Sequence, residues 1–209
     1  MRIGIACCLF ILSGCVSPRI STNWKMDPVF HERYFRILVV AVVPEADSLL
    51  RKTIETEAVK SLSGYGYYAV SAVSTFGPRG LAAATQEDTY LKLCNYGIDA
   101  VISFALVPEK ENIYAGTGQY LHPDSYYYNR IWNYKKMQLA PDFTRKGNRY
   151  SWETIMFDLL TLQAIGILRT SNFVNYQHNE ITNDVASLVL NRMLKEKIIQ
   201  QRKVALKAF

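Results

Sequence analysis

The sequence lacks an apolar stretch long enough to cross a membrane. A transmembrane helix needs about 20 consecutive apolar residues. The uncharged run near the N-terminus, Ile3–Leu12, is much shorter than that, and no internal run reaches membrane-spanning length. Hydrophobic residues make up 49% of the 209 residues. We therefore predict a globular domain with a substantial hydrophobic core and no membrane-spanning helix.

Recognisable catalytic and metal-binding motifs are also missing. The sequence contains no HExxH, no P-loop and no G-x-S-x-G elbow. Its histidines, His31, His122 and His178, are far apart, and Gly116–Gly118 lacks the third glycine of a dinucleotide fingerprint. We therefore predict no enzymatic activity, no metal site and no cofactor.

Two acidic residues, Glu153 and Asp158, belong to one predicted strand. Alternation along a regular strand places them on opposite faces of the sheet. This spacing argues against a shared acid–base role.

The N-terminus has the features of an export signal. Arg2 supplies one positive charge, Ile3–Leu12 forms an uncharged apolar segment, and the small residues Ser13 and Gly14 follow it. Small side chains before a cut suit the narrow pockets of a signal peptidase. The pattern predicts that residues 1–14 are a signal peptide.

Leu12-Ser13-Gly14-Cys15 resembles the lipobox of bacterial lipoproteins. The resemblance implies cleavage before Cys15 and attachment of a diacylglycerol and an acyl chain to that residue. Several chains give durable anchoring. Val16, rather than Asp, follows the cysteine. The resemblance then implies the outer membrane, with the domain facing the periplasm. An ordinary secretory signal is the alternative.

The four cysteines fit this interpretation. Cys7 and Cys8 lie in the predicted signal peptide and Cys15 carries the lipid, which leaves Cys94. A single remaining cysteine forms no intramolecular disulfide. Because its neighbours are apolar, we expect Cys94 to be a small buried residue rather than a reactive thiol.

Positive charge is concentrated in one segment. The formal net charge is +6, and residues 129–150 hold six cations against one acidic residue. A second basic cluster lies near the C-terminus, including a predicted tail at residues 201–209. For an exported chain, anionic lipid, glycan or an acidic protein is a better partner for these charges than nucleic acid. A solvated loop and a helix end are the alternative.

Hydrophobic patterning predicts a single α/β domain over residues 35–200, preceded by a lipidated tether at residues 15–34. Asp47 or Ser48 is expected to cap the first helix, Thr85 to cap the second, and Gly97 to end it. The predicted order is strand 35–43, a helix that follows its cap and ends at Gly64, strand 67–76, a helix over about 85–96 and strand 99–107.

Residues 109–149 form a predicted Tyr-rich and basic insertion. After it, residues 150–158 and 163–169 predict an antiparallel hairpin, and two adjacent apolar rows predict an amphipathic helix within 181–199. The fold class expected is α/β (α+β), a βαβαβ-type sandwich with a mixed sheet.

The segments "RILVVAVVPEADSLLRKTIETEAVKSLSGYGYYAV", "GIDAVISFALV" and "YSWETIMFDLLTLQAIGILRTS" are similar to a group of bacterial lipoproteins with a TolB-N-terminal-like or anticodon-binding-like α/β domain. The curli-secretion lipoprotein and periplasmic activators of penicillin-binding proteins use related folds. The group's commoner "ETNLYD…KLVW" hairpin is replaced here by Glu153–Asp158 and Gly166–Leu168. The resemblance implies no catalytic residues.

The insertion contains the strongest candidate for a binding surface. Tyrosine combines a large apolar contact with a polar tip and is enriched at interfaces. The alternative is that these aromatic residues cover the sheet. The candidate surface consists of Tyr126, Tyr127, Tyr128, Arg130, Trp132, Tyr134, Lys135 and Lys136.

Taken together, these features predict a lipid-anchored periplasmic protein, not an enzyme, that binds another component of the cell envelope. Two alternatives stay open. One is a subunit of an outer-membrane export or assembly complex, and the other is an envelope hydrolase or transferase whose site carries no known motif.

Overall fold

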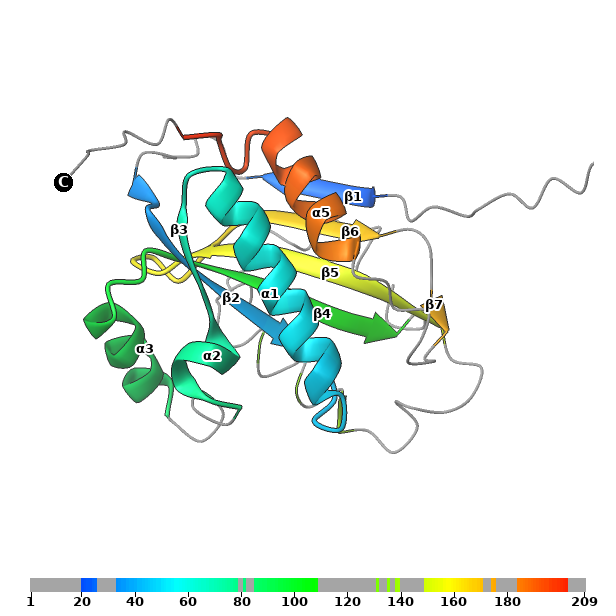
Figure 1. Ribbon diagram of the computed structural model, residues 1–209, viewed down its shortest axis with the longest axis horizontal. Helices are drawn as coiled ribbons and strands as arrows, with labels where there is room; N and C mark the ends of the chain where they lie inside the picture. The colour runs from blue at the N-terminus through cyan, green and yellow to red at the C-terminus, as the bar shows by residue number, and fades with distance from the viewer. Residues whose placement is uncertain are drawn as a thin grey trace, which may run out of the picture.

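The computed structural model describes residues 20–25, 33–78, 81, 85–108, 131, 135, 138–139, 149–170, 174–175 and 184–202. Within this part of the chain, seven strands form one mixed sheet (Figure 1). The predicted α/β class is confirmed. The strands are β1 (Ile20–Lys25), β2 (Arg36–Val42), β3 (Tyr68–Ser71), β4 (Ala100–Pro108), β5 (Arg149–Asp158), β6 (Ala164–Thr170) and β7 (Val174–Asn175).

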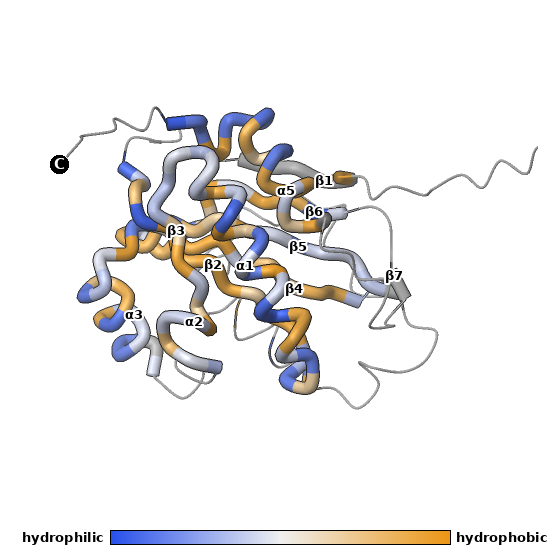
Figure 2. Tube along the Cα trace, viewed as in Figure 1, coloured by the Kyte–Doolittle hydropathy of each residue, from blue (hydrophilic) through white to orange (hydrophobic). Residues whose placement is uncertain are grey.

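The strand order is β1-β6-β5-β4-β2-β3, and β7 pairs with β5. Strand β2 pairs in parallel with both β3 and β4, whereas β5 runs antiparallel to β4 and β6. Because β2 and β4 lie inside the sheet with both faces covered, their β-branched and apolar residues are buried along most of their length. Figure 2 shows this hydrophobic centre of the sheet.

Two helices cover one face of the sheet. The helices α1 (Ser48–Gly64) and α5 (Asp184–Lys195) lie next to each other on that face (Figure 1). The predicted apolar rows of α5 pack inward, since Val189 and Met193 are fully buried. Together with Ile54 and Leu62 of α1 they form the larger hydrophobic cluster. Both helix predictions are confirmed.

A second hydrophobic cluster lies on the other face. It contains Leu38 of β2, Val101 of β4 and Leu93 of α3 (Gln86–Asn95). Ile131, one of the described residues of the predicted insertion, packs against this cluster. At this residue the insertion therefore contacts the second cluster, while the aromatic residues considered for a covering role lie outside the described residues.

The caps predicted for α3 are present. The side chain of Thr85 accepts a hydrogen bond from the backbone N–H of Asp88 at 3.1 Å, and Gly97 follows the helix with a φ of +68°. Asp47 occupies the cap position of α1, as predicted, but its side chain makes no capping hydrogen bond.

The strand predicted for residues 67–76 is wrong in its second half. Strand β3 ends at Ser71, and residues Ala72–Phe76 form the short helix α2. The hydroxyl of Ser71 accepts a hydrogen bond from the N–H of Ser74 at 3.1 Å and so caps this helix. The local strand preference of the sequence is overridden by this cap and by contacts with α1.

The tether predicted at residues 15–34 is also partly wrong, because residues 20–25 form β1. This strand pairs antiparallel with β6 and lies at the edge of the sheet. Edge strands tolerate polar residues because one side of their backbone has no partner. The sequence Ile20–Lys25, ISTNWK, consequently lacks the apolar pattern of a buried strand.

Cys94 is exposed, so the prediction of a buried residue is wrong. It lies on the outward side of α3, whereas the preceding Leu93 is fully buried in the second cluster. Consecutive residues of a helix point in different directions, so the apolar neighbours of Cys94 in the sequence did not indicate which way its side chain points. Over the described residues, no helix is both long and apolar enough to span a membrane.

Candidate functional site

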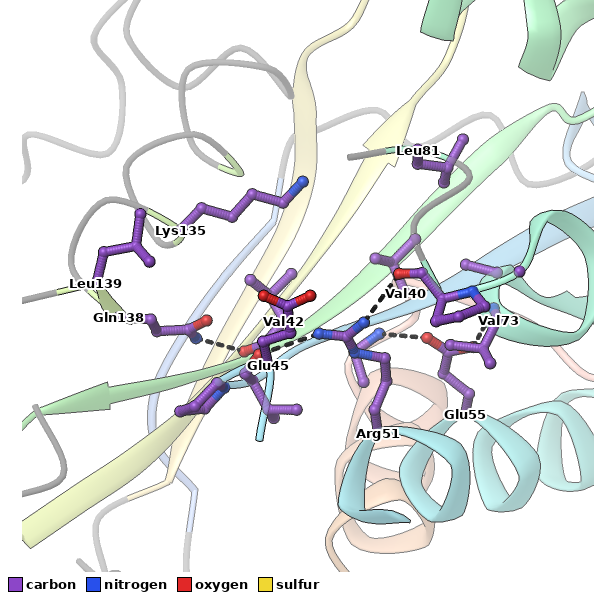
Figure 3. A pocket seen from close by; sticks show the side chains of 16 residues that line it. Val40, Val42, Glu45, Arg51, Glu55, Val73, Leu81, Lys135, Gln138 and Leu139 are labelled. Atoms are coloured by element: carbon purple, nitrogen blue, oxygen red, sulfur yellow. Dashed lines mark hydrogen bonds between the residues drawn. The ribbon is translucent and has the colours of Figure 1, made fainter. Parts of the chain in front are cut away.

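A cavity of about 430 Å³ lies at the carboxyl end of β2 (Figure 3). Its walls come from the end of β2, the first turns of α1, the beginning of α2 and three described residues of the insertion. Most of the lining is apolar, including Val40, Val42, Val73, Leu81 and Leu139. Concave sites of this size and composition are typical of small-molecule binding.

The topology explains why a cavity forms at this end. The connection after β2 leads into α1 on one face of the sheet, while the connection from β3 to β4 passes through α2 and α3, whose residues Ala72 and Leu93 belong to the cluster on the other face. Where connections depart to opposite faces, a crevice opens beyond the carboxyl ends of the strands. The cavity occupies this crevice.

Glu55 of α1 holds one wall of the cavity together. Its side chain is only 1% exposed. Strand β3 ends at Ser71, opposite Val39, so the N–H of Ala41 lies beyond the end of β3. Glu55 Oε1 accepts a hydrogen bond from that N–H at 3.0 Å.

The other oxygen of Glu55 binds the junction between β3 and α2. Oε2 accepts hydrogen bonds from Ser71 Oγ at 2.5 Å and from the N–H of Val73 at 2.9 Å. Burial raises the pKa of Glu55, while the three hydrogen bonds and the positive charge of Arg51 oppose that rise. Both oxygens of the Glu55 carboxyl group are therefore occupied by hydrogen bonds within the protein.

Arg51 lies one helical turn before Glu55 and borders the cavity. Its guanidinium donates hydrogen bonds from Nη1 to the carbonyl of Pro78 at 3.2 Å and from Nη2 to the carbonyl of Val43 at 3.3 Å. Its Nε is buried and has no hydrogen-bond partner. Two backbone carbonyls thus fix the orientation of the guanidinium at the cavity wall.

Lys135 supplies a second positive charge from the insertion (Figure 3). Burial lowers the pKa of Lys135, and the positive charge of Arg51 lowers it further. Among the described residues, neither Arg51 nor Lys135 forms an ion pair with a carboxylate. The carboxylate of Glu45 also borders the cavity, but this residue is exposed and has an interaction of its own.

Gln138 ties the insertion to the central sheet. Its Nε2 donates a hydrogen bond to the carbonyl of Val42 at 2.7 Å. The N–H of Leu139 donates to the carbonyl of Lys135 at 3.1 Å, which is helical geometry. These two contacts place the Lys135 side of the cavity against the end of β2.

Only one of the predicted site residues falls within the described part of the chain. Lys135 lies at the cavity rather than on an open aromatic surface. The remaining members of the candidate surface are outside the described residues, as are the lipobox positions and the three histidines. They are Leu12, Ser13, Gly14, Cys15, His31, His122, Tyr126, Tyr127, Tyr128, Arg130, Trp132, Tyr134, Lys136 and His178.

Sequence reasoning missed Arg51 and Glu55. The available signal for Glu55 was an acidic residue beside Ile54 on the apolar face of a predicted helix. Arg51 carries no motif, because an arginine in the first turns of a helix is common on solvated surfaces. Only the packing of α1 against the end of β2 gives these two residues a shared environment.

Glu153 and Asp158 lie on opposite faces of β5, as predicted. Asp158 Oδ2 accepts a hydrogen bond from the hydroxyl of Tyr34 in the first cluster at 3.2 Å. Glu153, on the side of the second cluster, is 3.9 Å from Arg169 Nη1. Over the described residues, no group of three metal-ligating side chains is present.

Comparisons with known proteins give limited similarity. No model of a protein family matches the chain, and no curated protein matches it. The PelC dodecamer from Paraburkholderia phytofirmans is 12% identical with a TM-score of 0.42, covering 89% of this chain and 99% of that chain. Lipoprotein GNA1162 from Neisseria meningitidis is 13% identical with a TM-score of 0.37, covering 82% and 99%. At these values neither structure assigns this chain a ligand, an assembly state or a location, and the resemblance to the TolB-N-terminal-like group stays a prediction.

Proposed function

We propose that this chain is a lipid-anchored protein of the bacterial cell envelope that binds another envelope component in the cavity at the carboxyl end of β2. The lipobox at Leu12–Cys15 supports the anchor. Val16 after the cysteine favours the outer membrane, with the domain on the periplasmic side.

The observation that supports the binding role is a pair of cations in one largely apolar cavity. Arg51 and Lys135 border the same space, and neither forms an ion pair within the described residues. Both side chains are partly buried, and charged groups withdrawn from water are normally paired in folded proteins. A cavity with two such cations in its wall is suited to holding a ligand, because a negative group of the occupant is attracted to both.

The chemistry of the lining favours binding over catalysis. General acid–base catalysis needs a group whose proton can reach the substrate. Both oxygens of Glu55 already accept hydrogen bonds from the fold, and the other lining carboxylate, Glu45, is exposed and has an interaction of its own. The sixteen lining residues, all in the described part of the chain, include no Ser, Thr, Cys or His.

The anchor is tested by expressing the full-length chain in a Gram-negative host and comparing wild type with Cys15→Ala. We expect wild type in the membrane fraction with an acyl mass increment on the N-terminal peptide. Cys15→Ala should lack this increment and stay uncleaved, whereas Cys94→Ala should behave like wild type. A wild-type chain without the acyl increment would overturn the anchor.

The binding role is tested by photo-crosslinking in whole cells. Leu139 borders the cavity and is 83% exposed, so a photoreactive residue there is accessible. Leu160, at 70% exposure, lies in the β5–β6 turn and serves as the matched control. We expect an adduct from position 139 that position 160 does not give. Identical adduct patterns, or none at position 139, would contradict binding at this cavity.

A further inference from the structure

Arg51 and Lys135 bring two partly buried positive charges to one cavity. They come from α1 and from the insertion, and both face the same cavity (Figure 3). Like charges repel more strongly where water is partly excluded. The downward shift in the pKa of Lys135, due to burial and then to Arg51, is in keeping with this arrangement. The site is more stable with an anion between the two cations.

The protein does not supply this anion from its own buried carboxylate. Glu55 Oε1 and Oε2 accept three hydrogen bonds from Ala41, Ser71 and Val73. An outward rotation of the Glu55 side chain would leave the buried N–H of Ala41 and two partly buried donors unpaired, which is costly. The other carboxylate of the described lining, Glu45, is exposed and has an interaction of its own, so the anionic group of a ligand is suited to contact both cations.

The guanidinium of Arg51 is prepared for such a ligand. Carbonyls of Val43 and Pro78 hold it from two different connections, the one after β2 and the one after α2. A group held in this way loses little further freedom on binding. Arginine provides directional donors to a carboxylate or phosphate, while the ammonium of Lys135 acts as a point charge.

The remaining walls of the cavity indicate the chemical character of the part of the ligand that does not contact the cations. Val40, Val42, Val73, Leu81 and Leu139 surround the cations with apolar surface. A small inorganic anion would leave this surface in contact with water. A ligand with an apolar body covers it and gains hydrophobic stabilisation. The cavity volume of about 430 Å³ lies within the range of sites for small organic ligands.

We propose that the cavity at the carboxyl end of β2 binds an amphiphilic anion, with its carboxylate or phosphate between Arg51 and Lys135 and its apolar body against the valine and leucine side chains. This inference rests on the proposed binding function and names the chemical class of the ligand. A fatty acid and a phospholipid are two sources of this chemistry.

The test is isothermal titration calorimetry on the lipidated full-length chain in phosphatidylcholine nanodiscs, with empty nanodiscs as the blank. The probes are octanoate, octyl phosphate, octanol and inorganic phosphate. We expect saturable binding of one or both amphiphilic anions, at least about tenfold tighter than octanol or inorganic phosphate. Preference for octanoate indicates a fatty acid, and preference for octyl phosphate indicates a phospholipid.

Variants separate the roles of the cations from general effects of charge. Arg51→Met and Lys135→Met should each weaken binding of the preferred anion by about tenfold or more. Arg51→Lys keeps the charge and should recover part of the affinity. Lys52→Met is the matched control, because Lys52 is the neighbouring exposed cation on α1 and does not border the cavity. Thermal unfolding of each variant verifies the fold.

Proton uptake gives a second readout. An anion next to Lys135 raises its pKa from the lowered value of the free protein, so binding in alkaline buffer should take up protons. Titration in two buffers of different ionisation enthalpy measures this uptake, and Lys135→Met should remove it.

The outcomes distinguish this inference from the proposed function. If octanol binds as tightly as the anions, or if Arg51→Met and Lys52→Met behave alike, the anionic class is wrong. Absence of binding by every probe, together with a specific adduct at position 139 in cells, overturns the ligand class and leaves the proposed function standing. If no probe binds and position 139 gives no specific adduct, the ligand class and the proposed function are both overturned.

Discussion

Replacement of Glu55 by Gln tests whether one buried carboxylate holds the wall of the cavity. The two side chains have nearly the same shape, but Gln has one oxygen and one NH₂ group. In either orientation the NH₂ group faces at least one donor, the buried N–H of Ala41 on one side or the partly buried Ser71 Oγ and N–H of Val73 on the other. Leaving a buried donor unpaired costs about 1–3 kcal/mol. We expect a loss in the free energy of unfolding of that size.

The pH dependence of this loss gives a sharper test. Burial, which is the largest cause, raises the pKa of Glu55 above its ordinary value of 4.5. At pH values between 4.5 and the raised pKa, the folded state then binds more protons than the unfolded state. The contribution of Glu55 to stability therefore falls as the pH rises through this window. Gln does not titrate, so the stability difference between wild type and Glu55→Gln should be largest at low pH and shrink as the pH rises.

Equilibrium urea unfolding at a series of pH values from about 4 to about 8 measures both quantities. Glu57→Gln is the matched control, because Glu57 lies on the same helix, is partly exposed and does not border the cavity. Two results would refute the reasoning. One is a Glu55→Gln variant as stable as Glu57→Gln at every pH. The other is a stability difference between wild type and Glu55→Gln that widens as the pH rises.

Two further predictions concern packing and exposure. A Cβ atom at Gly166 would lie 2.5 Å from Cγ2 of the buried Ile198, so Gly166→Ala should lower stability by about 1–3 kcal/mol. In a double-mutant cycle followed by thermal unfolding, Ile198→Ala should relieve part of that loss; purely additive effects would contradict the close contact. Cys94 is exposed, so the thiol of Cys94 in the native chain should react with Ellman's reagent without denaturant. A thiol that reacts only after unfolding would contradict this exposure.

Local patterns in the sequence predicted most of the elements. The β-branched run of β2 and the apolar rows of α5 depend on neighbours within a few residues, as does the cap at Thr85. The parallel pairing of β2 with β4 agrees with the predicted mixed sheet. These features are determined by the alternation and helical periodicity of the chain itself.

The misassigned segments depend on contacts between distant residues. Strand β1 exists because the edge of β6 offers backbone hydrogen-bonding groups, which polar side chains do not prevent. The strand predicted at 67–76 ends at Ser71, where Glu55 accepts hydrogen bonds from both Ser71 and Val73. Neither the pairing with β6 nor the hydrogen bonds of Glu55 can be recognised from a sequence pattern within β1 or within residues 67–76.

By itself, then, the sequence determined most of the succession of strands and helices and carried the resemblance to a lipobox at Leu12–Cys15, because both are local properties of the chain. Tertiary structure alone decided the cavity. It brought Arg51 of the first helix and Lys135 of the insertion to the carboxyl end of β2. The strand order produces that meeting, since consecutive connections leave β2 and β3 for opposite faces of the sheet.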